Sequence, residues 1–260
     1  MQHADRALGE SLLERRLATL QGAERPALPG DTARFLNWAE GHDGPAARAG
    51  LWFNPPVPVR YGDDAVEVLL VNERIVEQPY LFAALAGLRS PARVLDVGGA
   101  ESTVALSLAS LGHEIHVVDP RGYPLAHPGL TVHAVALHEL PAGAGFDAAV
   151  ALSSIEHFGL GGYGDRSAAA DQPDHAALRD LRERLRPGGT LVLTLPCAAE
   201  PAVDQLQRVY SAAALRELLA GWEVVDLSAA WRRDHFTWVR GSLGEPKGDV
   251  GVALVTARRS

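Results

Sequence analysis

The sequence predicts an α/β fold in which a mostly parallel sheet is covered by helices on both faces. From Asn72 onward, short segments rich in β-branched residues alternate with segments of helical periodicity. Repeated strand, helix, strand units of this kind build a doubly wound parallel sheet. The chain has 260 residues, of which 47% are hydrophobic and 22% charged, proportions that allow one large domain with a modest extension.

Residues 1–71 do not follow this alternation. Leu13, Leu17 and Leu20 have helical spacing and predict one amphipathic helix. Prolines and glycines then interrupt every pattern, at Pro26, Pro29, Gly30, Gly41, Gly44, Pro45, Pro55, Pro56 and Pro58. We interpret residues 1–71 as a helical, loop-rich extension that forms a lid or an acceptor wall, and residues 72–260 as the main domain.

The main domain is expected to begin with a helix from about residue 75 to 88. After it, hydrophobic runs predict strands at residues 93–97, 114–118, 131–135, 148–152, 190–195, 223–227 and 250–257. Helical periodicity predicts helices at residues 102–111, 174–185 and 211–219, and glycines such as Gly112 and Gly188 stop them. Ligands of such sheets bind at the carboxyl ends of the parallel strands.

The loop after the first of these strands is suited to a ligand. The run Val94-Leu95-Asp96-Val97-Gly98-Gly99-Ala100-Glu101-Ser102 leaves a buried strand, turns on two glycines and enters a helix. After Gly98, the next two glycine positions of a dinucleotide fingerprint hold Ala100 and Thr103, which disfavours a nicotinamide oxidoreductase. No G-K-[ST] sequence is present, so a phosphate-binding P-loop is excluded.

Asp119 ends the second strand, in Val117-Val118-Asp119-Pro120. A carboxylate at that position can accept hydrogen bonds from the two vicinal hydroxyls of a ribose, which predicts a nucleoside ligand. The alternative is that Asp119 only caps a turn with Pro120, because Asp-Pro is a frequent turn pair.

Four ordered motifs resemble the class I S-adenosylmethionine-dependent methyltransferases. They are the Val94–Gly98 run, Asp119, Phe146-Asp147, and Leu185-Arg186-Pro187-Gly188-Gly189-Thr190-Leu191. The resemblance covers residues 72–260 and implies a seven-stranded Rossmann-like sheet whose last strand is antiparallel. It implies a site for the methyl donor, S-adenosylmethionine, which we call the donor site. The residues of this site are Asp96, Gly98, Gly99, Ala100, Ser102, Asp119, Ala136, Leu137 and Ser153. Ala100 and Ser102 stand where the family usually has further glycines.

The residues that bind the methyl acceptor, which we call the acceptor side, are expected just after the fourth strand. The segment Ser154-Ile155-Glu156-His157-Phe158-Gly159-Leu160-Gly161-Gly162-Tyr163-Gly164-Asp165 resembles a branch of the family associated with carbohydrates and secondary metabolites. The resemblance implies O-methylation of a sugar, an oligosaccharide or a glycosylated small metabolite. His157 is the favoured base because an imidazole titrates near neutral pH. Asp165 and Glu156 are the other catalytic candidates, and Tyr163 is a candidate acceptor contact.

Competing interpretations remain for these residues. Ser153-x-x-Glu156 has the spacing of a helix capping box, which would make Glu156 structural. Glu156, His157, Asp165 and either Asp174 or His175 carry donors that Mg²⁺ or Mn²⁺ accepts, although their spacing matches no compact metal motif. The alternative functions are an N-methyltransferase acting on an amine and a non-catalytic nucleoside-binding module.

Composition narrows the partners. The formal net charge of -8 provides no basic field for a phosphate backbone, so nucleic acid is disfavoured. Cys197 is the single cysteine and cannot form an internal disulfide. No run approaches the roughly 20 apolar residues that cross a bilayer. We therefore expect a cytoplasmic protein with a small-molecule acceptor, and homo-oligomerisation stays open.

Overall fold

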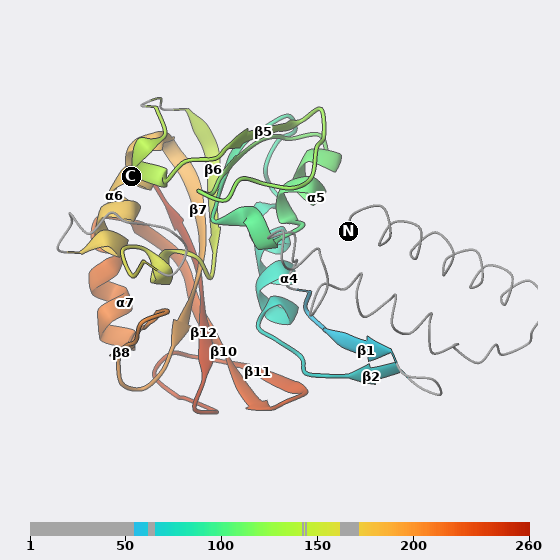
Figure 1. Ribbon diagram of the computed structural model, residues 1–260. Coiled ribbons are helices and arrows are strands. Elements are labelled where there is room, and N and C mark those ends of the chain that lie inside the picture. Colours follow the sequence, from blue (N-terminus) through green and yellow to red (C-terminus); the bar gives the residue numbers. More distant parts are fainter. Residues whose placement is uncertain (1–54, 62–65, 142, 144, 162–171) are drawn as a thin grey trace, which may run out of the picture. The chain divides into compact units, whose positions relative to one another are not determined.

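The computed structural model describes residues 55–61, 66–141, 143, 145–161 and 172–260 (Figure 1). The chain divides into two compact units, Met1–Asn72 and Glu73–Ser260. The helix expected around Leu13 to Leu20 lies outside the described residues. The described part of the first unit contains an antiparallel hairpin, β1 (Val59–Tyr61) and β2 (Val66–Val68), which the sequence pattern did not predict.

The second unit is built on one eight-stranded sheet, so the predicted α/β class is confirmed and the predicted seven strands are corrected to eight. The strand order is β11-β10-β12-β7-β6-β3-β4-β5. Its parallel half comprises β3 (Arg93–Val97), β4 (Glu114–Val118), β5 (Leu130–His133), β6 (Phe146–Leu152) and β7 (Leu185–Cys197). The other half comprises β10 (Glu223–Asp234), β11 (Thr237–Gly241) and β12 (Gly251–Arg258).

The additional strand lies in the segment between the last two predicted strands. β10 continues to Asp234, turns, and pairs antiparallel with β11, while β12 runs antiparallel to both β7 and β10. Trp231 is fully buried, and its indole N–H donates to the Ser242 carbonyl at 3.1 Å. A large aromatic residue facing the core lengthens β10 beyond the 223–227 segment that the hydrophobic run alone predicts.

Helices cover both faces of this sheet, as Figure 1 shows. One face packs against α4 (Arg74–Leu85) and α5 (Val104–Ser110), and the other against α6 (Pro173–Arg184) and α7 (Ala212–Leu218). Successive strand residues point to opposite faces. Val94 accordingly belongs to the α4 and α5 face and Leu95 to the α6 and α7 face. Both faces are buried, which explains the continuous hydrophobic runs in the sequence.

Short connections gather at the carboxyl edge of the parallel strands. Turns of 3-10 helix follow β3, β5 and β6, at Gly99–Glu101, Leu137–Glu139 and Ile155–His157. A small hairpin, β8 (Ala202–Val203) with β9 (Arg208–Val209), follows β7. The fold therefore brings the three predicted segments of the donor and acceptor sides to one edge of the sheet.

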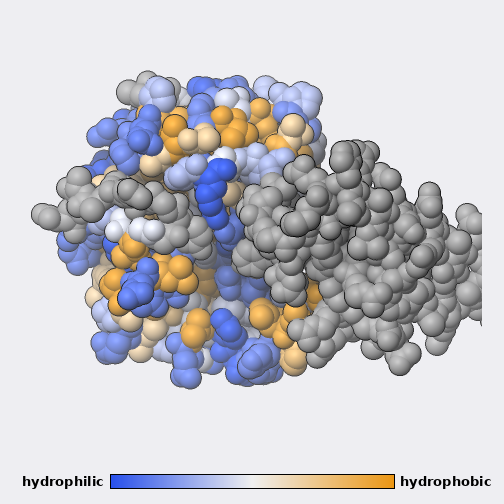
Figure 2. All heavy atoms as spheres, in the orientation of Figure 1, coloured by the Kyte–Doolittle hydropathy of each residue, from blue (hydrophilic) through white to orange (hydrophobic). Residues whose placement is uncertain are grey.

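The outer surface is mixed in character. On the face drawn in Figure 2, hydrophobic side chains of the described residues alternate with hydrophilic ones. The most exposed large hydrophobic side chains belong to different elements and loops, at Leu111, Val203, Leu206, Val225 and Phe236. Among the described helices, none is long and apolar enough to span a membrane.

Candidate functional site

The turn after β3 is held by contacts with both neighbouring strands. Gly98 has φ of +75°, and its backbone N–H donates to the Val118 carbonyl at 2.9 Å. A Cβ at this position would lie 2.4 Å from the Cβ of Ser154, which follows β6. Glycine is therefore required at Gly98 for backbone conformation and for close packing, a reason additional to ligand approach.

Asp96 lies beneath this turn as a buried acid. Its side chain is 3% exposed, and a Cβ on Gly99 would lie 2.6 Å from its Oδ2 atom. Burial and the neighbouring charge of Asp119 raise the pKa of Asp96 to about 7. Oδ2 accepts no hydrogen bond from any described residue. A buried polar atom without a protein partner is typical of a site that receives a ligand or water.

Asp119 lies at the carboxyl end of β4, where the sequence placed it. Its side chain is 2% exposed, and its Oδ2 accepts from the backbone N–H of Ala100 at 3.2 Å. The Arg121 side chain also binds it, with Nε 3.1 Å from Oδ1 and Nη2 3.0 Å from Oδ2. Asp119 also accepts the hydrogen bond of the turn alternative, because the backbone N–H of Arg121 lies 2.9 Å from Oδ1. Its position also joins the turn after β3 to the end of β4.

Three further residues of the predicted donor site make hydrogen bonds or core contacts within the protein. The Ser102 hydroxyl accepts from the Val104 N–H at 3.1 Å, and the Ser102 carbonyl accepts from the Tyr123 hydroxyl at 2.8 Å. The N–H of Ala136 donates to Glu139 at 2.9 Å. Leu137 is 4% exposed and packs in the core on the α6 and α7 face.

Ser153, a residue of the predicted donor site, follows β6 in an uncommon backbone conformation. It has φ of +42°, and its hydroxyl donates to Glu77 Oε1 at 2.5 Å. Its N–H donates to the Thr194 carbonyl at 3.1 Å. A non-glycine residue with positive φ stores local strain, and such residues cluster at functional sites. The alternative capping box is not formed, because Ser153 binds Glu77 and the turn that holds Glu156 begins after Ser154, without a side-chain cap.

Glu77 on α4 is a site residue that the sequence reasoning missed. Its side chain is fully buried, and it also accepts from the Thr194 hydroxyl at 2.6 Å and forms an ion pair with Arg74 at 2.5 Å. Arg74, Glu77, Leu81 and Leu85 follow one face of the helix, all buried. That spacing was a usable signal, because two charged residues on an apolar helical face indicate a buried polar network.

Glu156 and His157 lie together in the turn after β6. The Glu156 side chain is 1% exposed, and burial together with Glu77 raises its pKa well above the usual value. Its Oε2 has no hydrogen-bond partner among the described residues. His157 Nε2 lies 3.8 Å from Glu156 Oε1. Asp165 and Tyr163, the other predicted acceptor residues, lie outside the described residues.

The His157 ring has a defined tautomer. Its Nδ1 lies 2.6 Å from the Leu206 carbonyl, which can only accept, so Nδ1 carries the proton. In the neutral ring, the lone pair therefore belongs to Nε2. Burial lowers the pKa of His157, and the bond to the Leu206 carbonyl partly offsets this. The ring is thus a neutral imidazole near pH 7, a state suited to accepting a proton.

The backbone of this turn is fixed from the opposite side. Arg208 donates to the carbonyls of Glu156 at 3.1 Å and Phe158 at 2.7 Å. The Tyr210 hydroxyl donates a hydrogen bond to Asp174 Oδ2 at 2.9 Å. Within the described ranges, no group of three or more His, Cys, Asp or Glu residues is arranged to hold a metal ion. The structure therefore gives no support to the Mg²⁺ or Mn²⁺ possibility.

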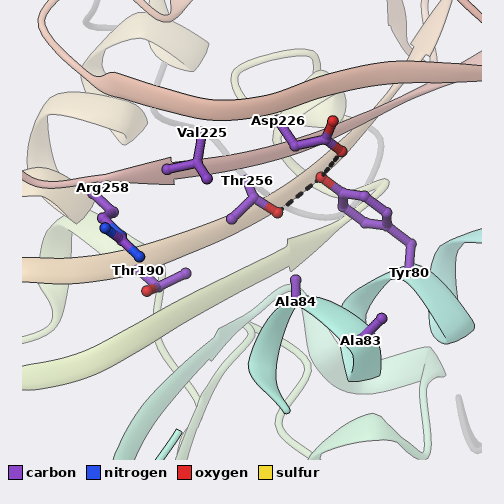
Figure 3. Close-up of a pocket in the computed structure, with 8 residues that line it drawn as sticks. All are labelled: Tyr80, Ala83, Ala84, Thr190, Val225, Asp226, Thr256 and Arg258. Carbon is purple, nitrogen blue, oxygen red and sulfur yellow. Dashed lines mark hydrogen bonds between the residues drawn. The ribbon is translucent and has the colours of Figure 1, made fainter. Parts of the chain in front are cut away.

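A pocket of about 280 Å³ lies away from this edge (Figure 3). The Tyr80 hydroxyl reaches across it to Asp226 Oδ2 and Thr256 Oγ1, each at 2.8 Å. Thr190 also lines it and pairs with Ala148 near the start of β6, so the pocket lies toward the amino ends of the parallel strands. None of the predicted site residues lines it.

A family model described as a Caenorhabditis protein of unknown function, DUF268, matches residues 135–238. A search of curated proteins finds no match.

Solved structures match over most of the chain. TehB from Haemophilus influenzae is 14% identical, covers 77% of this chain and 72% of its own, and gives a TM-score of 0.50. The 1,6-didemethyltoxoflavin-N1-methyltransferase of Burkholderia thailandensis, solved with S-adenosylhomocysteine, is 22% identical over 72% of this chain and 80% of its own, with a TM-score of 0.49. The N-methyltransferase NodS of Bradyrhizobium japonicum is 13% identical over 72% and 86%, with a TM-score of 0.47. The match to TehB shows the fold alone, a mostly parallel Rossmann-like sheet flanked by helices.

Proposed function

We propose that the protein is an S-adenosylmethionine-dependent methyltransferase whose donor binds at the carboxyl edge of β3 and β4. The observation that carries the proposal is the buried Asp119 carboxyl group at the end of β4, bonded to the Ala100 N–H of the glycine turn. This arrangement supports a ribose-binding role for Asp119, because an acid beside a close-approach turn suits a nucleoside ligand.

The residues present fit such a donor. Asp119 has two oxygens for the two vicinal hydroxyls of the ribose, and the backbone N–H groups of Ala100 and Arg121 already orient them. Asp96 Oδ2 is buried and lacks a partner among the described residues, so it can receive a polar group of the donor. When bound, S-adenosylmethionine supplies an electrophilic methyl group on a sulfonium.

We further propose that the acceptor is a hydroxyl of a sugar, an oligosaccharide or a glycosylated small metabolite. Methyl transfer to a hydroxyl requires removal of its proton, and His157 is the favoured base because its neutral tautomer has the lone pair on Nε2. Buried Glu156 has a raised pKa and favours the protonated form, so it does not add a negative charge beside the ring. Asp165 remains the alternative base.

The donor half of the proposal is tested by calorimetric titration with S-adenosylhomocysteine, the demethylated product. We expect one-to-one binding to the wild type and at least about a 100-fold loss in Asp119→Ala, because hydrogen bonds to a charged group are each worth about 1.5–3 kcal/mol. Asp226→Ala is the matched control, since this acid lies in the remote pocket. Equal losses in the two variants would remove Asp119 from the donor site.

The acceptor half is tested by acceptor profiling with methyl-labelled S-adenosylmethionine. Labelled ethers formed on hydroxylated sugars would support the proposal. Label appearing only on amines would replace it with N-methylation. Donor binding without transfer to any sugar or amine would favour a nucleoside-binding module that does not catalyse methyl transfer.

A further inference from the structure

The Asp119 carboxyl group already has a full set of hydrogen-bond donors within the protein. Oδ1 accepts from the Arg121 N–H at 2.9 Å and from Arg121 Nε at 3.1 Å. Oδ2 accepts from the Ala100 N–H at 3.2 Å and from Arg121 Nη2 at 3.0 Å. A carboxylate offers about four lone-pair positions, two on each oxygen. Two of these positions are therefore taken by backbone and two by a single side chain.

The two positions held by the Arg121 side chain are those that a ribose would use. A guanidinium presents two N–H donors side by side, one to each oxygen of a carboxylate. A vicinal diol also presents two donors, one to each oxygen. The backbone donors can remain in place when the diol binds, whereas the guanidinium donors cannot.

From this geometry we propose that the Arg121 side chain competes with S-adenosylmethionine for the Asp119 carboxylate. S-adenosylmethionine then binds only after the Arg121 side chain leaves Asp119. The inference rests on the proposed function, because it takes the nucleoside of S-adenosylmethionine as the ligand of Asp119. It assigns to Arg121 a role in setting the affinity of the donor site, which the resemblance to the methyltransferases does not imply.

The surroundings of Arg121 allow this movement. Its side chain is 34% exposed, and Nη1 binds Glu101 Oε1 at 2.5 Å. Glu101 is on the turn after β3 and is itself 22% exposed. The guanidinium can therefore swing toward solvent while it keeps its contact with Glu101, so the charge of Arg121 is not left in an apolar environment.

The competition reduces the measured affinity by a predictable amount. The apparent dissociation constant equals the intrinsic constant divided by the fraction of molecules in the binding-competent state. A minor state is commonly populated at up to about 10%. Removing the competitor is then expected to tighten donor binding about tenfold.

The test is calorimetric titration of S-adenosylhomocysteine into the wild type, Arg121→Ala and Arg121→Lys. This probe has no net charge near pH 7, so a change in long-range attraction does not explain a tighter complex. Arg93→Ala is the matched control because it removes the same charge at the start of β3, where Arg93 pairs with exposed Glu114. We expect about a tenfold gain for Arg121→Ala and a smaller gain for Arg121→Lys, since an ammonium lacks the planar fork of donors.

The outcomes separate the two proposals. Binding to the wild type with unchanged or weaker binding to both Arg121 variants would overturn the competition while leaving the donor site intact. Absence of binding to the wild type and to both folded variants would overturn the proposed function, and the competition with it. Should Arg121→Ala fail to fold, Arg121→Lys carries the decision, and thermal unfolding of each variant establishes which case applies.

Discussion

The two parts of the sheet edge that we propose for the methyl donor and the methyl acceptor are each held by contacts, and these contacts differ in range along the chain. On the donor side, Asp119 binds Ala100, 19 residues away, and Arg121, two residues away. After β6, next to the segment proposed for the acceptor, Glu77 binds Ser153 across 76 residues and Thr194 across 117. The donor side is thus specified by neighbouring strands and their turns, whereas the acceptor side depends on how α4 packs across the sheet.

Removing the long-range contact is expected to have the largest effect on stability. Glu77→Ala deletes the buried carboxyl group that faces the Arg74 guanidinium, and breaking a buried ion pair in this way costs about 3–5 kcal/mol. The measurement is the free energy of unfolding in denaturant. Glu114→Ala is the matched control, because its ion pair with Arg93 is exposed and worth at most about 1 kcal/mol. Similar losses in both variants would show that the Glu77 network does not hold α4 on the sheet.

Loss of the proposed base tests the acceptor side without removing its packing network. His157→Ala is expected to lower kcat by about 10²–10⁴ while donor affinity stays nearly unchanged, as for loss of general-base catalysis. His127→Ala is the control, since His127 lies in the loop before β5 and binds the Gly129 N–H.

The pH dependence supplies a second measurement on the same residue. Because burial lowers the pKa of His157, the base stays deprotonated to a pH below the ordinary histidine value. The wild-type rate should therefore fall only in more acidic solution, as His157 takes up a proton. Near wild-type kcat in His157→Ala would transfer the role to Asp165 or to alignment of the acceptor alone.

The close contact between the turn after β3 and Ser154, which follows β6, is tested at Gly98. Gly98→Ala places a Cβ against Ser154 and is expected to lower the free energy of unfolding by about 2–4 kcal/mol, through positive φ and overpacking. Gly188→Ala is the control, because Gly188 has φ of +76° and its Cβ would meet no atom within 4 Å. That variant should lose only about 1 kcal/mol. Equal losses would mean that the conformation of Gly98, and not its packing on Ser154, requires glycine.

The smallest expected effect concerns the buried acid of the donor side. The pKa of Asp96 is about 7 in the folded protein and 3.8 in the ordinary case. The folded state therefore binds the proton more tightly, so this contribution to stability is complete below pH 3.8 and is lost as the pH rises to about 7.

A neutral replacement avoids this loss. Asp96→Asn should gain stability relative to the wild type by about 1–3 kcal/mol between pH 5 and pH 8, with no further change above that range. Chemical denaturation at several pH values measures the difference. Exposed Asp249→Asn provides the control for removing one negative charge. A difference between Asp96→Asn and the wild type that does not vary with pH would contradict the raised pKa of Asp96.

The fold class, and the positions of the glycine turn and Asp119 at the ends of their strands, could be predicted from the sequence because they depend on local patterns. Buried parallel strands produce continuous hydrophobic runs, and the glycine turn and Asp119 follow directly from such runs. The extra strand β11 was missed because Trp231 and Trp238 lie in a segment rich in charge, where alternation across a hairpin is hard to distinguish from a loop.

The acceptor network could not be assembled from the sequence. Glu77, Ser153 and Thr194 meet only after α4 packs on the sheet against β7 and β12. The capping box stayed open as an alternative because sequence spacing does not reveal the positive φ of Ser153 or its partner on α4. The bond from Arg121 to Asp119 could not be predicted either, because it depends on side-chain geometry that the sequence pattern does not reveal.

The most direct test of the proposed donor site is a crystal structure with S-adenosylhomocysteine bound. We predict that both ribose hydroxyls lie on Asp119, that the Arg121 guanidinium is displaced toward Glu101, and that the sulfur faces the Ser153–His157 segment. Ligand bound in the remote pocket beside Tyr80 and Asp226, or at the edge with Arg121 still on both oxygens of Asp119, would contradict it.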